Sequence, residues 1–452
     1  MDRGLSPAGF AVRGSGAWSL SARPSRARYW VIAFAVTLAF ITYIDRACIG
    51  QTAPAIRKEL GLSTLQMGSV FSAFALAYAL FEIPSGWLGD WIGCRRLLMR
   101  IVLWWSFFTA ATGWARGLHS LVVIRFLFGA GEAGCFPNLA KSFSVWLPRS
   151  ERPLAEGIKA LSARWGGAVT PLLIVLLMRH FTWRAVFQIF GAIGVVWAAL
   201  FYFWYRDDPS DHPSVNAAEL ALIGHTAEKV QGNLDTPWGS FLRSRSAWLL
   251  WLQWFCYFYG FYFYLTWLPT YLQEGRGITV NRSALLASMP LFTAGVGSLF
   301  SGALSTWFAK RSRDLRVVRR RTAVTGFAAA TSLFVWFTLI RDPAWAMAAL
   351  SAASFAAELS GPISWVTCMD LGGKYVGALS GAMNTMGHLA GMAAPLLTGY
   401  VVQRSGNWHL AFAVSAGIYS LGIFCWLGID PVTPLDRTSA INRSALSPKI
   451  AR

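Results

Sequence analysis

Apolar residues recur along the chain in long runs that short polar segments separate. A helix needs about 20 consecutive apolar residues to cross the hydrocarbon core of a bilayer. Twelve stretches meet this requirement, at 29–53, 64–85, 97–115, 120–145, 154–178, 183–205, 247–270, 284–308, 322–340, 344–367, 376–402 and 408–429. The pattern therefore predicts an all-α membrane protein with twelve transmembrane helices.

The longest polar segment, 206–246, divides these stretches into six and six. It is rich in acidic residues and contains three prolines, which is typical of a linker between two helical bundles. The sequence therefore predicts five parts: a disordered basic arm at 1–28, a six-helix bundle at 29–205, a linker at 206–246, a second six-helix bundle at 247–429 and a tail at 430–452.

An internal repeat relates the two predicted bundles. Three positions of the fifth stretch recur in the eleventh at a shift of 224, pairing Gly157, Gly167 and Pro171 with Gly381, Gly391 and Pro395. After the second stretch, the segment 86–90 corresponds to 302–306 at a shift of 216. Parallel six-helix repeats are typical of carriers whose site lies between the halves, near the middle of the membrane. The repeat predicts two pseudo-symmetric bundles.

Composition and charge support a membrane protein with a defined orientation. Of 452 residues, 55% are hydrophobic and 13% are charged, and the formal net charge is +19. On a soluble protein, such an excess of cationic residues would indicate binding to nucleic acid. Here, 26 of the 40 Lys and Arg fall on the side of the termini, nine on the opposite side and five within predicted spans. This bias places both termini in the cytoplasm and argues against a nucleic-acid partner.

Four charged residues lie inside the first and fourth stretches. Asp45 and Arg46 are adjacent, whereas Arg125 and Glu132 are seven residues apart on one helical face. Charges in a membrane are costly unless they are paired or hydrated, so each is a candidate functional residue. The arginines could bind a carboxylate and the acids could carry protons. Alternatively, Arg125–Glu132 and Asp45–Arg46 are fixed ion pairs, or the arginines reach the outer interface.

The loop after the second stretch carries a specific motif. Residues 86–96 contain the pattern G-x-L-x-D-x-x-G-x-R-R, in which Asp90 could face a helix N-terminus or an arginine of the other half. The pattern resembles the signature loop of the major facilitator superfamily. Residues 125–133 resemble the superfamily's proton-coupling motif, whereas its antiporter motif is absent from the fifth stretch. The resemblance implies a conformational gate formed by Gly86, Asp90, Arg95 and Arg96.

Further motifs resemble the anion:cation symporter branch, which includes bacterial hexuronate, galactonate, glucarate, tartrate and phthalate permeases. They include Tyr43-Ile-Asp45-Arg46, Phe136-Pro137-Asn138 and Trp267-Leu-Pro269. By this resemblance, Asp45 and Glu132 match proton-coupling acids. The matching substrate-site positions are Arg46, Tyr78, Arg125 and Asn384.

Several positions depart from the family pattern. Thr306 replaces the acid of the second signature loop, and the repeat makes His388 the counterpart of Arg164. Arg164 and His388 could face the cavity and favour a dianionic or bulky acid; alternatively, Arg164 pairs with a buried acid and His388 is neutral. Glu358 is a further buried acid that could pair with His388 or bind a proton. Five aromatic residues at 257–267, Tyr262 among them, are expected to supply two or three members of the cavity wall.

Together these features predict a carrier that imports a small organic anion, a sugar acid or related carboxylate, by proton symport with alternating access. Metabolite export, anion exchange and sodium coupling are the alternatives. No constellation of residues in the sequence suits an enzyme, a metal site or a cofactor other than the coupling ion. We expect a monomer in the lipid bilayer of the bacterial cytoplasmic (inner) membrane.

Overall fold

A computed structural model describes residues 23–62, 64–224, 236–268, 271–312 and 314–435. Over these residues every secondary-structure element is helical, which confirms the all-α prediction. The α-helices are α1 (Ala27–Leu60), α2 (Thr64–Ile92), α3 (Cys94–Thr112), α4 (Leu118–Glu132), α5 (Cys135–Trp146), α6 (Arg152–Met178), α7 (Trp183–Trp204), α8 (Ala217–Ile223), α9 (Trp238–Arg243), α10 (Arg245–Thr266), α12 (Val280–Arg311), α13 (Leu315–Leu339), α14 (Pro343–Ala357), α15 (Gly361–Gly372), α16 (Val376–Ser405) and α17 (Trp408–Gly428). Short η1 (Pro209–Asp211), η2 (Tyr271–Gly275) and η3 (Gly373–Tyr375) complete the fold.

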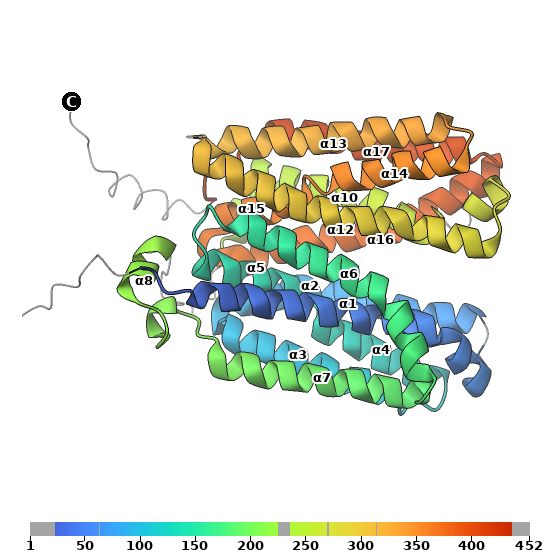
Figure 1. The fold of residues 1–452 in the computed structure, drawn as a ribbon, viewed down its shortest axis with the longest axis horizontal. Coiled ribbons are helices and arrows are strands. Elements are labelled where there is room, and N and C mark those ends of the chain that lie inside the picture. Colours follow the sequence, from blue (N-terminus) through green and yellow to red (C-terminus); the bar gives the residue numbers. More distant parts are fainter. Residues whose placement is uncertain (1–22, 63, 225–235, 269–270, 313, 436–452) are drawn as a thin grey trace, which may run out of the picture.

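The long helices form two groups that lie side by side (Figure 1). Helices α1 to α7 pack with one another, and α10 to α17 pack with one another. Two seams join these halves, one where α2 packs against α16 and one where α6 packs against α12. The short helices α8 and α9 belong to the linker between the halves, and the described chain begins and ends at the same end of the molecule (Figure 1).

Two of the predicted spans are broken helices. The fourth divides into α4 and α5, where Gly134 adopts a left-handed backbone conformation with φ of 83°. The tenth divides into α14 and α15 around Glu358, Leu359 and Ser360. The apolar runs are continuous through both breaks, so hydrophobic pattern alone did not predict them. Non-helical backbone is tolerated at membrane depth where protein covers it, and residues 133, 134, 358 and 360 are all buried.

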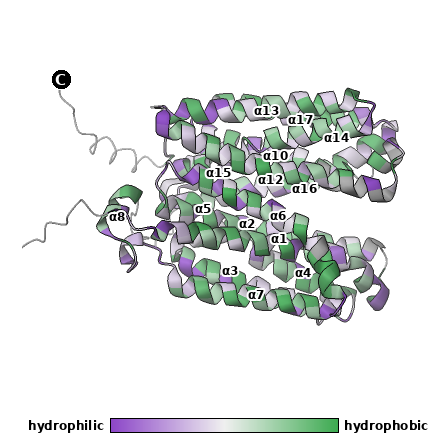
Figure 2. Ribbon diagram, in the orientation of Figure 1, coloured by the Kyte–Doolittle hydropathy of each residue, from purple (hydrophilic) through white to green (hydrophobic). Residues whose placement is uncertain are grey.

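The outer surface is apolar, as expected for contact with lipid. Large side chains such as Phe203, Leu339 and Leu396 are more than 70% exposed, and many others are exposed around both halves. Hydrophobic residues run along the helices, and hydrophilic residues gather toward the helix ends (Figure 2). Among the described helices, eight are long and apolar enough to cross a membrane. The protein is therefore a multi-pass membrane protein.

Glycines allow the halves to approach closely along both seams. A methyl group on Gly86 of α2 would overlap the carbonyl oxygen of Gly377 on α16. A methyl group on Gly157 of α6 would overlap the carbonyl oxygen of Ser298 on α12 in the same way. Gly157 and Gly381 are repeat-related, and Gly381 also faces the backbone of α2. The internal repeat seen in the sequence thus reflects equivalent packing at two seams.

Ion pairs close the end of the molecule that carries the termini. Asp370 at the end of α15 binds Arg152 of the other half at 3.0 Å and Arg319 of its own half at 2.6 Å. Arg28 at the start of α1 binds Glu151 and Glu219, each at 2.9 Å, and is buried. The helix therefore begins inside the predicted arm at 1–28. Residues 1–22 and 436–452 of the predicted arm and tail lie outside the described residues.

Candidate functional site

A cavity of about 1150 Å³ lies between the two halves. Its wall combines aromatic residues with four basic side chains, Arg46, Arg125, Lys159 and Arg164. Residues toward the end opposite the termini, including Gln51, Phe71 and Ser288, also line it. Of the predicted site residues, the cavity is lined by Arg46, Arg125, Arg164, Tyr262, Glu358, Asn384 and His388.

Arg46 pairs with Glu132 rather than with its neighbour Asp45. The Nε of Arg46 donates to Oε1 of Glu132 at 2.5 Å, which joins α1 to the end of α4. Glu132 is fully buried, whereas the Arg46 side chain keeps 19% of its surface exposed. The guanidinium also lies 4.6 Å from the ring centre of Tyr78, a cation–π contact. The alternative of fixed Asp45–Arg46 and Arg125–Glu132 pairs is therefore wrong for this conformation.

Within the described part of the chain, Arg125 is a basic residue of the cavity with two unpartnered donor nitrogens. Its side chain is buried and lies 4.1 Å from the ring centre of Phe128. Among the described residues, its Nε and Nη1 have no hydrogen-bond partner. Asp45 is buried within electrostatic range of Arg125, but the two do not form a salt bridge in this conformation. A planar guanidinium with free donors beside a cavity suits an anionic ligand.

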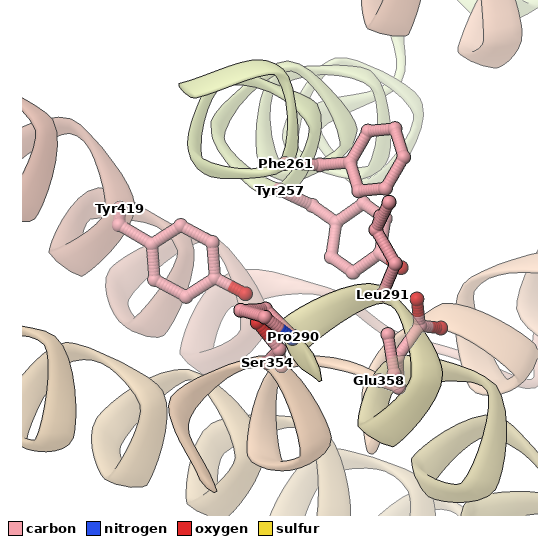
Figure 3. Close-up of a pocket in the computed structure, with 9 residues that line it drawn as sticks. Tyr257, Phe261, Pro290, Leu291, Ser354, Glu358 and Tyr419 are labelled. Atoms are coloured by element: carbon pink, nitrogen blue, oxygen red, sulfur yellow. The ribbon is translucent and has the colours of Figure 1, made fainter. Parts of the chain in front are cut away.

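Arg164 reaches across the cavity to the other half. Its Nη2 donates to Oε1 of Glu358 at 2.9 Å, and the second Glu358 oxygen accepts from the Ser298 hydroxyl at 2.6 Å. Figure 3 shows the Glu358 carboxyl group beside Leu291, below the Tyr257 and Phe261 rings. The Arg164 guanidinium lies 4.0 Å from the Phe261 ring centre. Arg164 therefore lines the cavity, as one sequence interpretation predicted, and pairs with a buried acid, as the other predicted.

His388 contacts an acid that sequence reasoning did not single out. Its Nε2 lies 3.6 Å from Oε2 of Glu82, which is fully buried on α2. The imidazole also packs against the Tyr78 ring, with 4.4 Å between ring centres. The expected alternative of a Glu358–His388 pair is wrong because Glu358 binds Arg164 instead.

A second pair missed by sequence reasoning lies on α6. Lys159 and Glu156 form a salt bridge at 2.5 Å and both line the cavity. The Lys159 ammonium also lies 4.7 Å from the ring centre of Trp365 on the opposite half. Lys159 falls within a predicted span, and its intramembrane charge was the signal that could have assigned it to the site.

The aromatic wall involves only part of the predicted set. Tyr257 and Tyr262 line the cavity, with Trp254 beside them, and Trp254 Nε1 donates to Asn384 Oδ1 at 3.4 Å. Tyr259 is buried away from the cavity lining. The Tyr264 side chain lies outside what the structure describes.

The signature loop lies at the closed end of the α2–α16 seam. Asp90 binds Lys141 at 2.8 Å and accepts backbone hydrogen bonds from Gly377 and Ala378 at 3.0 and 2.7 Å. Asp90 thus faces a helix N-terminus of the other half, one of the two positions that the sequence suggested. Arg95 donates to the Tyr202 carbonyl group within its own half, and Arg96 is exposed, so neither contributes to the seam in this conformation.

Over the described residues, no group of three His, Cys, Asp or Glu side chains could hold a metal ion. All six cysteines are free and buried.

Comparison with known proteins identifies the family. The sequence model of the family named Major Facilitator Superfamily matches residues 35–395. A probable sulfoacetate transporter of Cupriavidus necator is 37% identical, covering 91% of this chain and 96% of that protein. A probable galactarate/D-glucarate transporter of Bacillus subtilis is 30% identical, covering 84% of this chain and 87% of that protein.

Solved structures share the fold. The human organic anion transporter MFSD10 superposes with a TM-score of 0.71 at 14% identity, over 88% of this chain and 99% of that one. The transporter FucP in its outward conformation, named in a second structure as the fucose:proton symporter of E. coli, gives a TM-score of 0.70 at 16% identity, over 89% of this chain and 99% of that one. The chain is therefore a transporter rather than an enzyme, and it belongs to the anion-transporting branch of the major facilitator superfamily.

Proposed function

We propose that the protein imports a small organic anion, a sugar acid or related carboxylate, by proton symport with alternating access. The observation that carries this proposal is Arg125, a buried guanidinium beside the cavity with two donor nitrogens free of partners among the described residues. A carboxylate or sulfonate group would complete those bonds. The relatives that transport sulfoacetate and galactarate or glucarate suggest the substrate class.

The proposed membrane arrangement follows the distribution of charge. Twelve spans would cross the bacterial inner membrane, with both termini, the linker at 206–246 and the tail at 430–452 in the cytoplasm. The bundles at 29–205 and 247–429 would then rock against each other. The closed end carries Asp90 and Asp370 and would face the cytoplasm, so the cavity is in position to receive substrate from outside.

Coupling would operate through the Arg46–Glu132 pair and the nearby Asp45. Arg46 binds the Glu132 carboxylate. An anion bound at Arg46 and Arg125 would compete for those cations and leave the acids with less positive charge nearby. Protonation of Glu132 and Asp45 would then accompany binding of the anion. Tyr262, Asn384 and the Tyr78 ring behind Arg46 would orient the remainder of the substrate.

Uptake into proteoliposomes tests this function. The purified protein would be given an inward proton gradient and screened with radiolabelled glucarate, galactonate, tartrate, phthalate and sulfoacetate, with matched vesicles carrying a sodium gradient instead. We expect one of these acids to accumulate when the outside is acidic. Accumulation that requires a sodium gradient would mean that sodium, and not the proton, is the coupling ion. Movement only against a preloaded acid would identify an exchanger, and no movement of any acid would overturn the proposal.

A further inference from the structure

The two seams between the halves carry basic residues at repeat-equivalent positions. Arg164 on α6 and His388 on α16 are related by the repeat shift of 224. Arg164 binds Glu358 at 2.9 Å, and His388 lies 3.6 Å from Glu82. Each contact joins the first half to the second. Arginine keeps its charge at every physiological pH, whereas an imidazole can take up a proton at one ring nitrogen and release one from the other, so the two contacts differ in their ability to respond to protons.

His388 stands between the cavity and Glu82. The imidazole lines the cavity and its side chain is 13% exposed, whereas Glu82 is fully buried and does not line the cavity. The 3.6 Å separation is longer than a hydrogen bond, so the imidazole offsets the buried carboxylate only by longer-range attraction. A proton from cavity water would therefore reach Glu82 by way of the imidazole.

The charges around this pair link it to the substrate site. Arg46 on α1 lies within electrostatic range of both Glu82 and His388, and its guanidinium also binds Glu132 on α4. The other titratable groups facing the pair are the hydroxyls of Tyr78 on α2 and Tyr262 on α10. An anion bound to Arg46 would draw its charge away from both carboxylates at once. Binding of substrate would thus favour proton uptake by Glu82 as well as by Glu132.

Glu82 also occupies a mechanical position in the seam. Tyr78, Glu82, Gly86 and Asp90 lie four residues apart on one face of α2, and this face packs against α16. Asp90 and Gly86 contact α16 near Gly377 at the closed end, and the Glu82–His388 contact lies at the cavity end of the same face. Opening the closed end requires this entire face to separate from α16.

We propose that Glu82 and His388 form an additional proton-binding pair that controls separation of the α2–α16 seam; the proposal rests on the proposed symport. The imidazole takes a proton from cavity water at Nδ1 and, once the pair has closed from 3.6 Å to hydrogen-bond distance, gives its Nε2 proton to Oε2 of Glu82. The result is a neutral imidazole beside a neutral carboxyl group. The charge-assisted attraction across the seam is then replaced by a weaker one between neutral groups, and the closed end opens more readily.

Spin-label distance measurements on the substrate-free protein in nanodiscs test the pair. Labels on Arg100→Cys and Arg321→Cys, both exposed on outer helices of opposite halves, would report opening of the closed end. Native cysteines are all buried, which limits background labelling. Between pH 8 and pH 5 we expect the open population of the otherwise wild-type protein to rise by a factor within the roughly 5- to 150-fold range of coupled sites.

Substitutions test whether Glu82 and His388 cause this response. Glu82→Gln should hold the open population near its acidic level at every pH, and His388→Asn should remove most of the response by breaking the proton path. Glu59→Gln, at the exposed end of α1 and outside the cavity lining, is the comparison variant and should retain the rise at low pH. A wild-type response that persists in both Glu82→Gln and His388→Asn would overturn the proposal, as would a wild-type protein without a response.

This experiment needs no transported acid, so its result is independent of the uptake screen. A pH response that depends on Glu82, together with no uptake of any acid, would remove the proposed symport and leave the proton-binding pair in place. Proton-driven uptake that is unchanged by Glu82→Gln, with a pH-independent seam, would remove the pair and leave the symport in place.

Discussion

Asp90 and Thr306 occupy equivalent positions in the two halves, and each accepts a hydrogen bond from the backbone of a helix in the opposite half. Asp90 accepts from the N–H of Ala378 at 2.7 Å, and Thr306 Oγ1 accepts from the N–H of Leu154 at 3.1 Å. Ala378 and Leu154 are themselves related by the repeat shift of 224. Thr306 therefore makes the contact equivalent to that of Asp90, but without a charge.

Removing the charge of Asp90 should open the closed end. Asp90→Asn retains an acceptor but loses the charge that binds the α16 N-terminus and Lys141. A hydrogen bond to a charged group is worth about 1.5–3 kcal/mol, so we expect the open population to rise about tenfold or more. Spin-label distances between positions 100 and 321 would measure it.

Asp314→Asn is the matched control because Asp314 caps α13 within a single half, where it accepts from Arg316 and Val317. This variant should leave the distance distribution unchanged. Equal opening in Asp90→Asn and Asp314→Asn would mean that loss of a cap loosens the protein in general, without a role for the seam.

Gly86→Ala should separate α2 from α16. The added methyl group would overlap the carbonyl oxygen of Gly377, and overpacking of this kind costs about 1–3 kcal/mol. We expect a lower midpoint of thermal unfolding, followed with a thiol-reactive dye that reports exposure of the six buried cysteines.

The comparison is Gly50→Ala, also inside a helix, where an added methyl group meets no atom within 4 Å. This change should leave the midpoint unchanged or raise it, since alanine favours a helix over glycine by about 1 kcal/mol. If Gly86→Ala were as stable as Gly50→Ala, the close approach of the halves at Gly86 would not hold in the protein.

Arg125→Lys should weaken substrate binding. A lysine keeps the positive charge but replaces the planar, two-pronged donor by a point charge, so we expect the KM for the acid found in the uptake screen to rise about tenfold. Arg184→Lys is the control, since Arg184 pairs with the partly exposed Glu59 away from the cavity. An unchanged KM in Arg125→Lys would assign Arg125 a structural role.

Helix positions followed from the sequence because burial in lipid requires long apolar runs. The helix breaks at Gly134 and near Glu358 did not, because the apolar pattern continues through both. The predicted position of Asp90 against a helix N-terminus was correct as one of two options. This option could be predicted from the sequence because an acidic residue in a loop after a helix is stabilised by the N–H groups at the start of a neighbouring helix.

The partners of the buried charges depend on packing between distant segments. Arg46 and Glu132 are 86 residues apart, and Arg164 and Glu358 are 194 apart. Adjacent residues such as Asp45 and Arg46 point in different directions on a helix, so proximity in sequence misled the pairing. Glu82 was not singled out because it lies near the end of the predicted span 64–85, whereas α2 continues to Ile92 and places Glu82 well inside the helix.

Glu132→Gln should separate substrate exchange from accumulation. Glutamine cannot carry the proton and no longer neutralises Arg46, so the arginine stays available to the anion. We expect exchange of labelled for unlabelled acid at or near the wild-type rate, and loss of accumulation driven by a proton gradient. Asp45→Asn should behave likewise. Glu59→Gln, at the exposed end of α1, should retain both activities. Wild-type accumulation in both Glu132→Gln and Asp45→Asn would remove these acids from the coupling mechanism.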